Sequence, residues 1–443
     1  LDQQPHSVWI AKNKSIQEIL IDFKALREIG GLKIDWMQGK QAQKFDVLLS
    51  YDSINWEKTF TVNLNINSTS YIRLPEFETR FLKLKLSQSN NSKGLGIKDI
   101  EIIKVEESNT LNNFFRYIAK NSPKGYYPRY FLDQASYWTI SGVSGDTKEA
   151  LINEDGMVEV EKASFSIEPV VKVGNKIYDW SNVKTSQSLT YFIDGKTYDY
   201  TPTVNWHTDD IDLQVGITSY GNANNSSKLL IGYTLKNNTN KNQTIDFYLL
   251  IRPFQVNPYY QTLNLAGGVG TIKKISLDAS KDRVEVDNTS LYFTQKFESF
   301  FAGSFYSANP TELIRSNHKE VVMAETDNLG LNGGFVKYTI KLKAGQSHTL
   351  FAIAPYHSKN INDSELKTKN IVDTIAKVSD YWRGKTEYVK FNLPSTAEHL
   401  LKTYRANLMY ILINRDIHGI QPGSRSYERS WMRDGSLTSS ALL

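Results

Sequence analysis

The sequence predicts a mainly β protein in which two β-rich regions precede a short helical segment. Short segments of alternating apolar and polar residues continue to about residue 107, and a second series lies between residues 126 and 358. From about residue 361 the apolar residues change to helical spacing. A chain of 443 residues that is 40% hydrophobic is long enough for two or three domains with their own cores.

The first region, residues 1–107, is expected to be a β-sandwich. Polar turn clusters separate its alternating segments, which is typical of antiparallel strands. The predicted strands are 19–23, 32–36, 45–50, 59–64, 70–74, 80–86 and 100–105.

A linking helix is expected over residues 108–125. Leu111, Phe114, Phe115 and Ile118 have helical spacing, and Pro123 with Gly125 should end the helix. The next region, 126–358, is too large for one small sandwich and predicts two stacked antiparallel sheets. Its predicted strands include 165–171, 213–218, 228–235, 243–251, 334–342 and 348–354.

The last part of the chain is expected to be helical. Residues 359–394 form a helical linker, with Ile371, Ile375 and Trp382 on one face. Residues 395–443 begin a further helical domain, whose first helix should start at a capping box from Ser395 to Glu398. Two helices are too few to bury a core of their own.

Composition excludes several classes of protein. A net charge of +5 with scattered lysines does not indicate nucleic-acid binding, and no apolar run is long enough to span a bilayer. Without cysteine there are no disulfides or thiolate metal sites, and the seven histidines show no metal-ligand spacing. Because the first residue is Leu1 rather than Met, the natural start and any signal peptide are expected to precede this chain.

The residue types needed to bind a sugar occur together near the end of the chain. Arg433 offers a planar fork of donors, Asp434 offers acceptors, and Trp431 offers a flat apolar face. The residues from Gly435 onward read as a loop entering a buried helix. From chemistry alone two interpretations stay open: a sugar site, or an Arg–Asp pair that holds a loop.

The N-terminal region resembles a coagulation factor 5/8 type C, or discoidin, domain. The stretches that carry the resemblance are 2–9, 21–23, 31–36, 45–56, 80–84 and 96–102. It implies a jelly-roll β-sandwich that binds carbohydrate, with its first strand missing and with a possible structural Ca²⁺. His6, Trp9 and Trp36 are conceivable sugar contacts, although Trp9, Trp36 and Trp56 match positions that build the core.

The remainder resembles bacterial proteins in which a large β-sandwich leads into an (α/α)6 barrel of the six-hairpin type, as in family 15 glucoamylases. The stretches concerned are 130–138, 165–169, 251–258 and 423–435. The resemblance implies that Arg433 and Asp434 bind sugar hydroxyls with Trp431 beside them. Tyr427 and Arg429 are secondary candidates.

Inverting hydrolysis also needs a general acid and a general base. By the same resemblance they come from later barrel hairpins, and so are expected beyond Leu443. Glu428 is expected to be an ion-pair partner of Arg429.

Together these features predict the N-terminal part of a bacterial glycoside hydrolase, truncated at both ends and inactive as it stands. It should be exo-acting, inverting and glucoamylase-like, and should carry a carbohydrate-binding module. The expected partner is an oligo- or polysaccharide, no catalytic cofactor is expected, and the protein should be secreted, periplasmic or at the cell surface. Two alternatives stay open: a non-catalytic binding or adhesion protein, and a glycoside phosphorylase.

Overall fold

The computed structural model describes residues 7–12, 15–89, 94–278, 282–316, 323–358, 361–417 and 419–442. It divides into two compact units, one of Leu1–Asp133 with Gly303–Glu320 and one of Gln134–Ala302 with Val321–Leu443. The boundaries near residues 107, 125 and 358 that the sequence predicts stay predictions. The segment 303–320, which the sequence places inside the second β-rich region, belongs to the first unit.

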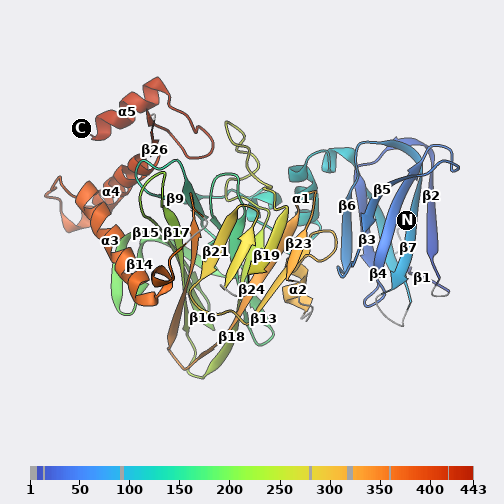
Figure 1. Ribbon diagram of the computed structural model, residues 1–443, viewed down its shortest axis with the longest axis horizontal. Coiled ribbons are helices and arrows are strands. Elements are labelled where there is room, and N and C mark those ends of the chain that lie inside the picture. The colour runs from blue at the N-terminus through green and yellow to red at the C-terminus, as the bar shows by residue number, and fades with distance from the viewer. Residues whose placement is uncertain are drawn as a thin grey trace. The chain divides into compact units, whose positions relative to one another are not determined.

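The first unit contains two four-stranded antiparallel sheets (Figure 1). Its strands are β1 (Trp9–Ile10), β2 (Gln17–Glu28), β3 (Gly31–Trp36), β4 (Ala42–Ser50), β5 (Glu57–Val62), β6 (Thr69–Arg73), β7 (Glu78–Ser89) and β8 (Gly96–Ile103). The sheet orders are β1-β8-β3-β6 and β2-β7-β4-β5. This is the β-sandwich that the alternating segments predict.

Residues on alternate positions of these strands fill the core. Trp36 is 2% exposed, its ring centroid lies 5.5 Å from that of Phe45, and its indole N–H donates to the Ser70 hydroxyl at 2.9 Å. Trp9 and Trp56 are only half-buried, so the core prediction holds fully for Trp36 alone of the three tryptophans. His6 lies outside the described residues.

The helices of the first unit explain why residues 303–320 belong to it. After η1 (Val105–Glu107), α1 (Leu111–Lys120) begins at Thr110, whose hydroxyl accepts from the backbone N–H of Asn113. Phe115 of α1 is fully buried, and its ring centroid lies 5.1 Å from that of Phe305. The other short helices are η2 (Arg129–Leu132) and α2 (Pro310–Ser316).

The second unit is built on two large sheets. The first contains β9 (Trp138–Gly142), β10 (Glu149–Asn153), β11 (Val158–Glu159), β12 (Ser166–Val173), β13 (Lys176–Tyr178), β18 (Gln243–Arg252), β22 (Ser299–Ser304) and β24 (Asn332–Leu342). The second contains β14 (Lys184–Ile193), β15 (Lys196–His207), β16 (Ile211–Tyr220), β17 (Lys228–Asn237), β19 (Lys274–Asp278), β20 (Arg283–Val286), β21 (Thr289–Phe293), β23 (Ala324–Thr326) and β25 (Ser347–Pro355). Apolar side chains from both sheets form one continuous core.

A second, smaller core covers the other face of the second sheet. Here α3 (Thr368–Thr386) lies against β15 and β16 and buries Ile371 and Ile375. The Tyr191 ring reaches this core because Gly216 and Gly232 leave room for it: a Cβ atom would approach the ring to 2.6 Å and the hydroxyl to 2.5 Å, respectively. Any larger residue at these two glycines would clash with Tyr191.

The helical end of the unit differs from the sequence prediction in two details. After η3 (Asp363–Leu366), α3 and η4 (Ser395–Ala397), α4 (Glu398–Ile413) begins without a side-chain cap, so the predicted capping box at Ser395 does not form. The 3-10 turn η4 carries the Ser395 backbone into the helix instead. After the β26 (Arg415–Asp416) and β27 (Gly419–Ile420) hairpin, α5 (Met432–Leu442) has no buried residue, which corrects the expected buried helix.

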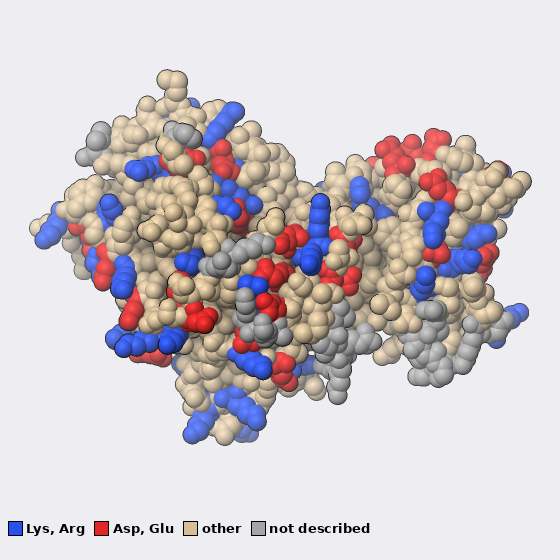
Figure 2. Space-filling model, viewed as in Figure 1, with Lys and Arg blue, Asp and Glu red and all other residues tan. Residues whose placement is uncertain are grey.

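Acidic and basic side chains are interspersed over the visible face of each unit, as the scattered lysines predict (Figure 2). Within the described residues, no helix combines the length and the apolar character needed to cross a membrane.

Candidate functional site

The first unit has an open cleft of about 910 Å³ where β3, β6 and β8 meet their loops. Strand ends, the turn after α1 and α2 all contribute to its walls, which are residues 35–39, 41, 66, 68, 69, 71, 98, 99, 121–123, 126, 312, 313 and 315. This volume lies within the range of small-molecule sites, which is about 300–1,000 Å³. The cleft is therefore large enough for more than one sugar ring.

Side chains that donate hydrogen bonds and side chains that accept them both face the cleft. Gln38, Lys98 and Asp99 are exposed at its rim, and Arg315 lies with its guanidinium carbon 4.3 Å from the Tyr126 ring centroid. A mixture of donors and acceptors at the rim suits a ligand with many hydroxyl groups.

Hydrogen bonds from the β5–β6 loop hold α2 and the segment before it in place as one wall of the cleft. The Glu312 carboxylate accepts from the Ser68 backbone N–H at 3.0 Å and from its hydroxyl at 2.8 Å. Asn67 donates to the Phe305 carbonyl and accepts from the Asn309 N–H at 2.7 Å. Burial raises the pKa of Glu312, while the hydrogen bonds from Ser68 oppose that rise. The wall is thus fixed before any ligand arrives.

The second unit brings three of the sequence-predicted site residues together. The Arg429 guanidinium lies 4.1 Å from the Trp431 ring centroid, and the Tyr427 ring centroid lies 6.2 Å from it. The Trp431 indole nitrogen is buried and has no hydrogen-bond partner among the described residues. Because Arg429 covers one face of the indole and the indole nitrogen is buried, only the other face of the ring is left for a ligand.

Arg433 and Asp434 lie on the first turn of α5 instead of before it. The Arg433 side chain is 84% exposed, and its nearest guanidinium nitrogen is 3.6 Å from the Asp434 carboxylate. An ion pair between neighbours on one exposed turn contributes little to stability and does not tie the loop to another element. Both side chains remain accessible, and their predicted role in holding a sugar stays a prediction.

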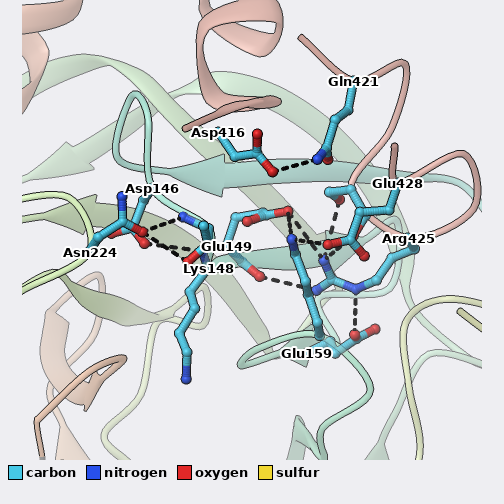
Figure 3. Close-up of polar contacts among 12 residues, drawn as sticks. Asp146, Lys148, Glu149, Glu159, Asn224, Asp416, Gln421, Arg425 and Glu428 are labelled. Carbon is cyan, nitrogen blue, oxygen red and sulfur yellow. Dashed lines mark hydrogen bonds and ion pairs between the residues drawn. The ribbon is translucent and has the colours of Figure 1, made fainter. Parts of the chain in front are cut away.

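A buried ionic cluster anchors the loop that carries this motif (Figure 3). Arg425 is 2% exposed; it donates to the Glu159 carboxylate at 2.7 Å and to the Glu149 carbonyl at 3.1 Å. Glu159 also accepts from the Asn257 N–H at 3.0 Å, which connects the cluster to the loop after β18. A single arginine therefore joins the motif loop to β10 and β11 of the first large sheet.

Lys162 completes the cluster by pairing with both Glu149, at 3.2 Å, and Glu428. Glu428 thus has an ion-pair role, but its partner is Lys162, whereas the expected partner Arg429 stacks on Trp431. Burial raises the pKa of Glu149 to about 7, although Lys162 and Arg425 act in the opposite direction. The Glu428 carboxylate therefore helps to hold the motif loop in place through its ion pair with Lys162.

The backbone of the loop is strained at Tyr427. This residue has φ of 65° and its side chain is 52% exposed. A left-handed conformation costs a non-glycine residue about 1–2 kcal/mol. Such outliers persist where surrounding structure imposes them and often lie at functional sites.

Comparison with known proteins bears on the first unit. Residues 1–99 match the F5/8 type C domain. This match agrees with the F5/8 type C resemblance that the sequence analysis gives for the N-terminal region. No curated protein matches the chain significantly.

Solved structures similar to the F5/8 type C domain include modules from three bacteria. Chitosan-binding module 2 of a Paenibacillus sp. IK-5 chitosanase/glucanase, in complex with chitotriose, is 17% identical over 23% of this chain and 81% of the module, with a TM-score of 0.22. A Clostridium perfringens module in complex with GalNAc-β-1,3-galactose has 15% identity, coverage of 23% and 78%, and a TM-score of 0.21. The family 32 module of Streptococcus pneumoniae EndoD has 12% identity, coverage of 23% and 78%, and a TM-score of 0.21.

The sequence did not point to the cleft or to the ionic cluster. Glu312 and Ser68 lie 244 positions apart, and Arg425 and Glu159 lie 266 apart, so no local pattern links them. Among the described residues no group of three or more His, Asp or Glu side chains is arranged to hold a metal ion. The Ca²⁺ site implied by the resemblance stays a prediction.

Proposed function

We propose that the first unit binds a saccharide in its cleft, and that the chain is the N-terminal part of an exo-acting, inverting bacterial glycoside hydrolase. One observation carries the binding proposal. The F5/8 type C domain contributes the ends of β3, β6 and β8 to a cleft whose rim offers both donors and acceptors. A protein that acts on polysaccharides in this way would be secreted, periplasmic or at the cell surface.

Saccharide binding is tested by calorimetric titration with soluble α-glucan, β-glucan, chitin-derived and galactose-containing oligosaccharides. Gln38→Ala and Lys98→Ala remove rim groups that are exposed, so folding should be unaffected. Each should weaken binding of the preferred saccharide about tenfold, or by about 1.4 kcal/mol. Lys44→Ala is the matched control, since Lys44 is exposed on β4 and does not line the cleft. Equal affinity in all four proteins would refute the cleft as the site.

The hydrolase part of the proposal is supported by the geometry of the motif loop. Arg433 and Asp434 follow Trp431 on the first turn of α5, where their side chains are 84% and 33% exposed and offer donors and acceptors. These are groups that can hold the terminal sugar of a chain. Arg425 and Lys162 hold the loop in place, so Arg433 and Asp434 are not needed for that purpose.

This part is tested on the protein as its gene encodes it. Asp434→Ala should reduce release of the terminal sugar at least a hundredfold while leaving the fold intact, because the Asp434 side chain is 33% exposed and α5 has no buried residue. Unchanged turnover would refute the assignment. Cleavage that depends on inorganic phosphate would identify a phosphorylase, and binding without turnover would identify a non-catalytic adhesion protein.

A further inference from the structure

A pocket of about 260 Å³ lies in the second unit, apart from the motif loop. It is formed where the start of β9 and the end of β10 face β14 and β15. The register between β14 and β15 shifts between Ser188 and Thr190, so the strand bulges next to the pocket. Bulges of this kind often lie beside binding sites because they redirect side chains.

Two adjacent aromatic residues form the outer wall of the pocket. Tyr137 is 71% exposed and Trp138 is 36% exposed. Tyrosine and tryptophan combine a large apolar face with one polar group, and they lose little conformational entropy when a ligand covers them. An exposed pair beside a pocket is therefore a surface suited to binding.

The backbone that carries this aromatic pair is held in place. The Glu154 carboxylate accepts from the Tyr137 N–H at 2.9 Å, and the Glu154 N–H donates to the Tyr137 carbonyl at 3.1 Å. The Ser136 N–H donates to the Tyr260 hydroxyl at 3.2 Å. Because the segment is already ordered, binding would require little further loss of freedom.

The polar residues that line the pocket favour an uncharged ligand. Gln187 is exposed at the rim. The Ser188 and Thr203 hydroxyls, which are partly and fully buried, donate to the Thr190 and Thr201 carbonyls at 3.0 and 2.9 Å, so they offer acceptor lone pairs to a ligand. Among the described residues that line the pocket there is no lysine or arginine and Glu154 is the one acidic residue, so phosphate or another anion would meet no cation from them. Apolar faces with uncharged donors and acceptors match a neutral pyranose ring.

We propose that Tyr137, Trp138 and Gln187 form a second saccharide-binding site, which takes one or two neutral sugar units of the polymer held by the first unit. The choice of ligand rests on the proposed function, whereas the site itself rests on its own pocket. Two sites on one chain would raise the apparent affinity for a long polymer above that for a short oligosaccharide.

The test uses the 443-residue chain and the oligosaccharide panel above, with saturation-transfer NMR and calorimetry as readouts. In a Gln38→Ala/Lys98→Ala background, which weakens the cleft, a residual weaker binding step should remain. Trp138→Ala and Gln187→Ala should each reduce that step at least tenfold. Tyr137→Ala serves if Trp138→Ala destabilises the unit. Phe192→Ala is the matched control, because Phe192 is 52% exposed on β14 and does not line the pocket.

The outcomes separate the two sites. If the residual step persists in the Trp138, Gln187 and Tyr137 variants, or if the cleft variants abolish all binding, the second site is refuted and the first stands. If the cleft variants change nothing while the Trp138 and Gln187 variants lose binding, the cleft proposal fails and the second site stands. Absence of binding to every saccharide in the panel would refute both.

Discussion

The cleft of the first unit and the motif loop of the second use polar side chains in opposite ways. At the cleft, Gln38 and Lys98 are exposed, because strand pairing and the Glu312 contacts already fix the walls. The motif loop is held differently, because its Arg425 is buried against Glu149 of β10 and Glu159 of β11 and so joins the loop to the first large sheet. Polar residues near a candidate site can therefore either support its structure or face a ligand. The supporting residues are buried, and the ligand-facing residues are exposed.

The largest expected effect breaks the support of the motif loop. Arg425→Ala leaves the Glu159 and Glu149 carboxylates buried without their guanidinium partner, which should destabilise the second unit by about 3–5 kcal/mol. Denaturant unfolding measures this loss. Arg433→Ala is the matched control for stability, because an 84% exposed side chain should change unfolding by less than about 0.5 kcal/mol. Similar losses in both variants would contradict the division between supporting and ligand-facing residues.

A smaller effect is expected from pH. The pKa of Glu149 is about 7 in the folded chain, against an ordinary value of 4.5. Between these values the folded state holds a proton that the unfolded state has released, so the free energy of unfolding should fall as pH rises from about 4.5 to 7. The fall should be on the order of 3 kcal/mol and should stop above pH 7, where both states are ionised.

Glu149→Gln isolates this contribution, because the amide does not titrate in that range. Unfolding of the two proteins in urea, measured at half-unit steps of pH, should give a difference that changes through the window and is level outside it. An unchanging difference between pH 4.5 and 7 would mean that Glu149 has an ordinary pKa in the folded chain.

A still smaller effect on stability is expected at the wall of the cleft. Glu312→Ala removes the acceptor for both Ser68 donors and should destabilise the first unit by about 2 kcal/mol. It should also weaken saccharide binding, since α2 is one wall of the cleft. Glu312→Gln keeps one acceptor oxygen and should lose less on both measures. Full saccharide affinity in a folded Glu312→Ala protein would show that α2 is not part of the site.

Much of the first unit could be predicted from its sequence. The alternation of apolar and polar residues along β3 and β4 predicts which side chains face the core. The helical spacing of Phe114, Phe115 and Ile118 predicts α1. These patterns are local, so a single sequence contains them. The motif from Trp431 to Asp434 could be located for the same reason, since its members are neighbours.

The contacts that join distant segments could not be predicted. Glu312 reaches Ser68 only because residues 303–320 return to the first unit, and Glu428 meets Lys162 instead of Arg429 because the loop bends at Tyr427. A local signal also fails at Ser395. The sequence from Ser395 to Glu398 is that of a capping box, yet Ser395 lies in a 3-10 turn and does not cap α4. Long-range pairing depends on the path of the loops, which no short pattern encodes.

The smallest expected effect tests the bend itself. Tyr427→Ala and Tyr427→Gly both remove the ring that faces Trp431, so the difference between them isolates the backbone. Glycine adopts φ near 65° without strain, whereas alanine does not, and the glycine variant should therefore be more stable by about 1 kcal/mol. Urea unfolding of the two proteins measures this difference. Equal stabilities would remove the evidence that Tyr427 is held in a strained conformation, whereas a stable glycine variant with weaker sugar binding would show that the ring is kept for the ligand.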